Sequence, residues 1–100
     1  MKFSSFLINR RRGVLLGALT DCAPGMAVAA DLLAKFCLAI SLRATQDEVE
    51  ADLAWLAERN LVQLGRAGPL LTVVITRAGR DVAARLVVVP GVDIADTAEG

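Results

Sequence analysis

Apolar residues recur at helical spacing in two segments at the start of the chain. The first segment predicts a helix that begins near Phe6, with Ser4 and Ser5 as caps, and stops at Pro24-Gly25. The second segment predicts a helix from about Ala27 to Ile40. Its expected buried stripe consists of Ala29, Leu32, Leu33, Phe36, Cys37 and Ile40. The N-terminal part of the chain is therefore expected to be helical.

Thr45 and Glu48 mark the start of a third helix, which should run to about Asn60. Their spacing is that of a capping box, in which each residue's side chain accepts a hydrogen bond from the other's backbone amide. Acidic residues in this first turn also suit the helix dipole. The expected core face of this helix consists of Val49, Leu53 and Leu56, with Trp55 at its edge.

The hydrophobic period changes from helical to alternating after residue 60. Leu61 to Leu64 alternates, Gly65 to Pro69 is rich in turn-forming residues, and Leu70 to Ile75 is a β-branched run. This pattern predicts a β-hairpin with a five-residue connection. Thr76 can then cap a short closing helix that should extend to about Leu86.

The length and composition narrow the possible chemistry. The chain has 100 residues, of which 55% are hydrophobic, so it suits one compact domain with a buried core. It contains no histidine and no tyrosine, which excludes serine–histidine and cysteine–histidine nucleophile pairs and histidine-ligated metal sites. No carboxylate pair, glycine-rich phosphate loop or metal-ligand cluster stands out. We therefore expect no enzyme, no catalytic or metal-binding residues, no cofactor and no small-molecule substrate.

Cys22 and Cys37 both lie in apolar helical patterns and are expected to be reduced packing residues, with a disulfide as the alternative. Reduced thiols favour a cytoplasmic location. Arg10 to Leu19 also resembles a twin-arginine export signal, but its apolar stretch is short and Asp21 precedes the cysteine, so we favour an ordinary helix there. No apolar stretch is long enough and free enough of charges to predict a membrane span.

The order of the predicted elements, three helices, a hairpin and a closing helix, resembles a winged helix-turn-helix domain. Asp52 to Val62 resembles the end of a winged-helix third helix entering the first wing strand, and Leu71 to Arg80 resembles the second wing strand and the step into the closing helix. The resemblance covers residues 7 to 90 and implies a mainly α fold of the α+β class with a two-stranded wing. We expect this domain at residues 1–90 and a flexible acidic tail at residues 91–100.

A narrower resemblance depends on the closing helix and the residues after it. Thr76, Gly79 and Val82-Ala83, followed by Val89-Pro90-Gly91-Val92, resemble a family of small winged-helix proteins of Mu-like transposable phages and prophages. Members of that family typically continue with basic and proline residues, whereas this chain continues with Asp93-Ile94-Ala95-Asp96. The resemblance implies a phage or prophage protein in which an acidic segment takes the place of the basic one.

Eleven basic and eleven acidic side chains give zero net charge, but the two kinds are separated along the chain. The winged-helix resemblance implies that Thr45 to Asn60 is the recognition helix, yet this segment has a net charge of −4. Phosphate contacts need lysine and arginine, which lie instead near the N-terminus and in the wing. The leading interpretation is a transcriptional regulator that contacts double-stranded DNA through those regions. The candidate DNA-binding residues are Lys2, Arg10, Arg11, Arg12, Arg66, Arg77 and Arg80.

The alternative is an adaptor that binds another protein without contacting DNA. Oppositely charged surfaces on one small domain favour association by electrostatic complementarity. Apolar residues near both ends of the domain would supply contact area for a homodimer. The candidate contact residues are Phe3, Phe6, Asp47, Glu50, Leu86 and Val88. The expected partner is a second copy or a phage or host protein, and no contact with a membrane is expected.

Overall fold

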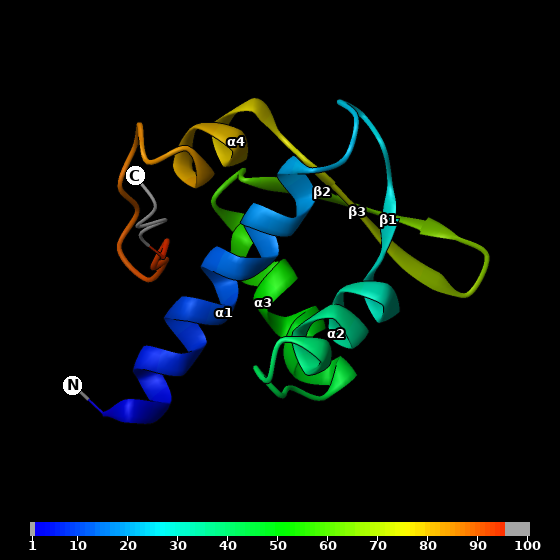
Figure 1. The fold of residues 1–100 in the computed structure, drawn as a ribbon. Helices are drawn as coiled ribbons and strands as arrows, with labels where there is room; N and C mark the ends of the chain where they lie inside the picture. Colours follow the sequence, from blue (N-terminus) through cyan, green and yellow to red (C-terminus); the bar gives the residue numbers. More distant parts are fainter. Residues whose placement is uncertain (1, 96–100) are drawn as a thin grey trace.

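A computed structural model describes residues 2–95 of the chain as a small α+β protein (Figure 1). In these residues, four helices accompany one three-stranded antiparallel sheet with the strand order β1-β3-β2. The elements in chain order are α1 (Phe3–Thr20), β1 (Val28–Ala29), α2 (Ala30–Ala39), α3 (Gln46–Glu58), β2 (Val62–Ala67), β3 (Leu70–Ile75) and α4 (Arg77–Ala83). None of the helices in this part of the chain combines the length and apolar character that a membrane span needs.

The core forms where α1 packs against the other helices and the central strand β3 (Figure 1). Its largest fully buried side chains are Leu15, Leu16, Leu19, Val49, Leu53, Leu56, Val62, Val73 and Cys37. The two thiols are free, Cys37 in this core and Cys22 half-buried beside it, so both are packing residues as predicted. The helical spacing of Val49, Leu53 and Leu56 therefore identified the packed face of α3.

The start of α3 confirms the capping box. The Glu48 amide donates to Thr45 Oγ1 at 3.1 Å, and the Thr45 amide donates to Glu48 Oε1 at 2.8 Å. The predicted start of α1 was wrong, because this helix begins at Phe3 and includes Ser4 and Ser5. Its N-cap is Lys2, which makes no side-chain cap, so the two serines do not mark this helix start.

The strand β1 was not predicted. The helical spacing places Val28 and Ala29 in the second helix, but they pair with Val73 and Thr72 of β3. Val28 is buried there, and α2 begins only at Ala30. A two-residue strand has no measurable alternation, so only the neighbouring strand, distant in sequence, reveals it. The sheet therefore has three strands where the sequence indicated two.

The hairpin and the closing helix also differ from the prediction in their ends. Ala67 pairs with Leu70, so the connection is Gly68-Pro69 and not a five-residue turn. The backbone pairing of β2 with β3 continues through residues of low strand propensity. The buried residues of the two strands fix the register, and this register is kept as far as the turn. The helix α4 ends at Ala83 and not near Leu86, since Arg85 takes a φ of 67° and turns the chain away.

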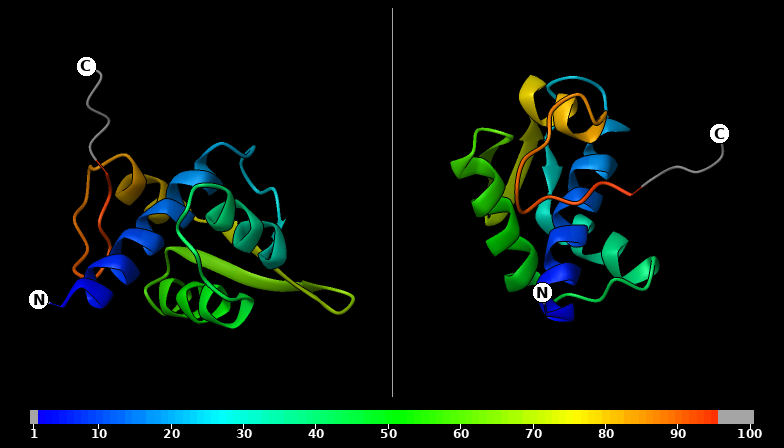
Figure 2. Two further views of the ribbon diagram at one scale, coloured as in Figure 1. Left: turned by 60° about the horizontal axis from the view of Figure 1, so that its bottom comes forward. Right: turned by 90° about the vertical axis from the view of Figure 1, so that its left-hand side faces the viewer.

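Residues 89–95, which we call the strap, pass across α1 (Figure 2). Val89 and Val92 pack against the core, and the Asp93 amide donates to the Asn9 carbonyl at 3.0 Å. At Gly13 the strap lies so close that an added Cβ would overlap the Asp93 carbonyl. Residues 91–95 were predicted to belong to a flexible tail, but they are packed against α1. The remainder of that predicted tail, residues 96–100, lies outside the described residues.

Candidate interaction surfaces

An ion-pair cluster joins the middle of α1 to α3. Asp52 of α3 is buried, and its carboxylate is bonded to Arg11 Nε and lies 3.5 Å from Arg12 Nε. The side chains of Asp52, Arg11 and Arg12 are only 5%, 10% and 16% exposed. We call these three residues, together with Trp55 and Arg59, the clamp. Buried charges persist in a protein only when they are paired in this way.

Trp55 lies between two guanidinium groups in the clamp. The Cζ atoms of Arg12 and Arg59 are 3.8 Å and 3.5 Å from the ring centroid, so the two groups must cover opposite ring faces. Arg12 Nη1 also donates to the Gly91 carbonyl of the strap at 3.2 Å. Burial lowers the pKa of Arg12, while the neighbouring Asp52 raises it. The clamp thus connects α1, α3 and the strap.

Two further arginines are bound within the molecule. Arg10 Nε lies 2.8 Å from Asp93 Oδ2 of the strap, with both side chains about one-third exposed. Arg80 donates from Nη1 to the Thr20 carbonyl at 3.2 Å and from Nη2 to the Cys22 carbonyl at 3.0 Å. Arg80 therefore satisfies the carbonyl end of α1, where a cation is favourable.

These contacts divide the candidate DNA-binding residues into two groups. Arg11 is not at the surface, contrary to the sequence interpretation, and Arg10, Arg12 and Arg80 are also bound to other parts of the chain. Lys2, Arg66 and Arg77 are exposed. Arg66 contacts only the nearby Pro69 carbonyl, at 3.4 Å, among the partners found in the described residues. Lys2 is the N-cap of α1, whereas Arg66 lies on β2 and Arg77 at the start of α4.

The acidic residues of α3 are also less alike than the sequence suggests. Asp52 is internal, whereas Asp47 is exposed and Glu50 accepts from Gln46 Nε2 at 3.0 Å. Glu48 is used by the capping box, and the hydrogen bond from the Thr45 amide lowers the pKa of Glu48. The start of α3 is therefore an acidic, self-capped helix end.

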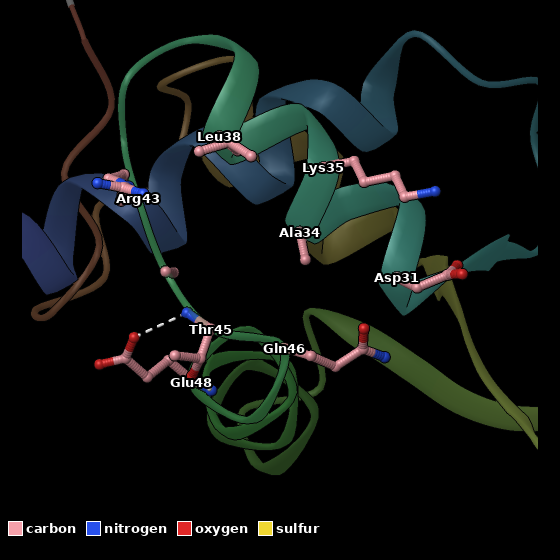
Figure 3. Close-up of a pocket in the computed structure, with 9 residues that line it drawn as sticks. Asp31, Ala34, Lys35, Leu38, Arg43, Thr45, Gln46 and Glu48 are labelled. Carbon is pink, nitrogen blue, oxygen red and sulfur yellow. Dashed lines mark hydrogen bonds between the residues drawn. The ribbon is translucent and has the colours of Figure 1, made fainter.

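An open hollow of about 660 Å³ separates the start of α3 from α2 (Figure 3). Asp31, Lys35 and Leu38 line it from α2, Glu48 lies across it at the start of α3, and Arg43 lies on the connection between the two helices. Its four charged residues are two acids and two bases. In residues 2–95, no group of three or more cysteine or acidic side chains is arranged to hold a metal ion. The hollow thus has no dominant charge that would select an anion or a cation.

Apolar side chains remain exposed near both ends of the described chain. Phe3 and Phe6 are 71% and 43% exposed, and their rings stack with centroids 6.4 Å apart. Leu86 and Val88, after α4, are 75% and 87% exposed. The N-terminal end of α1 and the segment after α4 lie on the same side of the molecule (Figures 1 and 2). We call these four candidate contact residues the terminal patch.

The helix α2 also exposes apolar residues that the sequence interpretation placed in the core. Its buried residues are Ala30, Leu33 and Cys37, whereas Leu32, Phe36 and Ile40 are 59%, 42% and 46% exposed. The predicted stripe was too wide, because α1, α3 and the sheet cover only half of it. We call these three exposed residues the α2 face.

Sequence reasoning missed the role of Asp52, which entered only as part of the net charge of residues 45–60. The signal was present in the spacing, since Val49, Asp52, Leu53 and Leu56 recur at i, i+3, i+4 and i+7 on the buried face. A carboxylate at such a position requires a cationic partner.

Comparisons with protein-family models, curated proteins and solved structures found no match to this chain.

Proposed function

We propose that the chain is a winged-helix protein-interaction module that associates with a second copy of itself. The winged-helix part of this proposal is supported by the element order and by the hairpin β2–β3, which would be the wing. A non-enzymatic role in the cytoplasm belongs to the same proposal, and the two free thiols are compatible with a reducing compartment.

The observation on which the proposal rests is that the arginines near the N-terminal end are bound within the molecule. Arg10, Arg11 and Arg12 are bound to Asp93 and Asp52, so two carboxylates already offset two of the three positive charges in the region that the sequence suggested for phosphate contact. The helix α3, which would be the recognition helix, has an acidic first turn that is already capped. Both features oppose binding to a polyanion, which depends on free lysine and arginine.

The terminal patch supplies the contact area that self-association needs. The exposed fractions of its four residues correspond to several hundred Å² of apolar surface, divided between the N-terminal end of α1 and the segment after α4. A standard interface buries about 800 Å² per partner, so neighbouring residues must contribute as well. A phage or host protein with an apolar surface would compete with the second copy for the same patch.

Sedimentation equilibrium of the intact chain tests this proposal. We expect the mass average to rise with concentration in the micromolar range, and the double variant Phe3→Ser/Phe6→Ser to remain a monomer. Leu70→Ser, which removes an exposed leucine at the hairpin, is the matched control and should associate like the unchanged chain. A monomer at high micromolar concentration would overturn the proposal.

A second candidate function is duplex DNA binding through the wing. It is favoured by Arg66 on β2 and Arg77 at the start of α4, which are both exposed. A labelled duplex should then bind with a steep salt dependence that becomes shallower in Arg66→Ala/Arg77→Ala. Variants at Arg11 and Arg12 do not suit this test, because they would break the clamp. The absence of binding at low salt would exclude this candidate.

A further inference from the structure

We propose that the contact between copies is head-to-tail, with Phe3 and Phe6 of one copy entering the groove between α1 and α2 of the next. The inference rests on the self-association proposed above and names the surface that receives the terminal patch. It follows from two features at opposite ends of α1. Exposed aromatic residues lie at the start of the helix, and an apolar groove lies beside its end.

The projecting end is the first two turns of α1. These turns form the lower-left end of the ribbon in Figure 1. Phe3 and Phe6 lie there at i and i+3 with Lys2 immediately before them, so the end presents two stacked rings and a cation. Aromatic residues of this kind are typical anchors of interfaces.

The groove lies at the other end of the same helix. It has a volume of about 170 Å³, and its lining is almost entirely apolar. Leu32 and Phe36 of the α2 face form one wall, and Ala18 and Cys22, at the end of α1 and just after it, lie on the opposite side. An amphipathic helix end bearing large apolar side chains is the usual occupant of a groove between helices.

The charges at the two surfaces are complementary. Asp21 is the one charged residue that lines the groove, and it is exposed. Arg80, which lies near the end of α1, is already bonded to the carbonyls of Thr20 and Cys22 and is not part of the groove lining. A cation at the tip of the entering segment therefore has one acidic partner at the groove, and Lys2 supplies that cation.

The length of α1 makes the contact intermolecular. The helix has 18 residues, which separate its two ends by about 27 Å at 1.5 Å per residue. Phe3 and Phe6 cannot therefore reach the groove of their own chain while α1 is intact. A contact between two different surfaces is heterologous and differs from the two-fold pairing of the terminal patch with itself.

Complementation between two variants tests this arrangement. Phe3→Ser/Phe6→Ser removes the entering residues and keeps the groove, whereas Leu32→Ser/Phe36→Ser alters the groove and keeps the entering residues. All four positions are exposed, so circular dichroism should show both variants folded. Each variant alone should sediment as a monomer, and an equimolar mixture should form a one-to-one complex. The mixture should bind at least about tenfold more tightly than either variant binds itself.

Different results identify which proposal fails. If the unchanged chain is a monomer, self-association itself is wrong. If Leu32→Ser/Phe36→Ser associates like the unchanged chain, self-association stands but the groove is not the receiving surface. If neither variant associates and the mixture forms no complex, the head-to-tail arrangement is also overturned. In a further variant, Asp21→Asn, the affinity between copies of the chain should fall severalfold. This affinity should also depend less on the salt concentration.

Discussion

Two sets of arginines that look alike in the sequence have opposite environments in the folded chain. Arg10, Arg11 and Arg12 are bound to carboxylates of α3 and the strap, whereas Arg66 and Arg77 are exposed on the hairpin and at the start of α4. The N-terminal set contributes to the packing of three segments. The exposed set contributes mainly to the surface potential.

Position in the element decides between these two outcomes. Arg11 shares the helical spacing of Leu15 and Leu19, which are fully buried, so its side chain points into the core and needs a buried anion. Arg66 lies near the tip of the β2–β3 hairpin, where it is exposed. A run of basic residues in a sequence therefore indicates a charged surface only when its helical positions face solvent.

Asp52→Ala should have the largest effect on stability. It would leave Arg11 and Arg12 in a buried site without their carboxylate, a loss that typically destabilises a protein by about 3–5 kcal/mol. Urea unfolding monitored by Trp55 fluorescence measures the change in the free energy of unfolding. Asp47→Ala, at an exposed position of the same helix, is the control and should change it by less than about 0.5 kcal/mol. Similar values for the two variants would refute the distinction between the two sets.

Gly91→Ala tests the contact between the strap and the clamp. Gly91 has a φ of 95°, and an added Cβ would lie 2.7 Å from the Trp55 ring. We expect a loss of about 2–3 kcal/mol, from backbone strain together with displacement of the ring. Gly25→Ala is a matched control, because Gly25 has a φ of 80° but nothing within 4 Å of an added Cβ. Equal melting temperatures for the two variants would show that the strap does not press on Trp55.

Arg80→Ala and Arg77→Ala separate a bound from an exposed arginine within one helix. Arg80→Ala removes two hydrogen bonds to the carbonyl end of α1 and should destabilise the protein by about 1 kcal/mol. Arg77→Ala should leave stability within about 0.5 kcal/mol of the unchanged chain. Thermal unfolding of both variants gives the comparison, and a larger loss for Arg77→Ala would contradict the assignment of Arg77 to the surface.

The sequence was informative about elements whose signals are local. The capping box at Thr45 and the spacing of the leucines on α1 and α3 predicted helices that the structure contains. The strand β1 and the docking of the strap depend on contacts with residues far away in the chain, such as Val73 and Asn9. No local pattern encodes these contacts, and the predictions failed at those places.

The residues that suggested a phage-protein resemblance have structural roles in this chain. Thr76 Oγ1 accepts from the Gly79 amide at 3.0 Å, and an added Cβ at Gly79 would overlap the Leu61 carbonyl. Val82 is in the core, and Gly91 lies against Trp55. The motif thus describes how α4 and the strap pack, which explains why it indicated a scaffold more clearly than an activity.

The candidate site was less predictable than the fold, because exposure depends on which half of an amphipathic helix finds a partner. The stripe on α2 correctly included Leu33 and Cys37, but Leu32 and Phe36 of the same stripe are exposed. Hydrophobic spacing gives the direction of an apolar face, whereas its covered width depends on the neighbouring elements. The receiving groove proposed for the second copy could not be found from the sequence for this reason.

The smallest expected effect concerns the pH dependence of the acidic start of α3. The Thr45 amide hydrogen bond lowers the pKa of Glu48 in the folded chain below its ordinary value of 4.5. The stabilisation from this carboxylate is therefore fully present above pH 4.5 and is lost as the pH falls through the lowered pKa. The difference in unfolding free energy between the unchanged chain and Glu48→Ala, measured by urea unfolding at successive pH values, should shrink as the solution is acidified.

The same series with Asp47→Ala is the control, because Asp47 makes no part of the capping box. A difference for Glu48→Ala that stays constant down to pH values well below 4.5 would show that the charge of Glu48 does not stabilise this helix end.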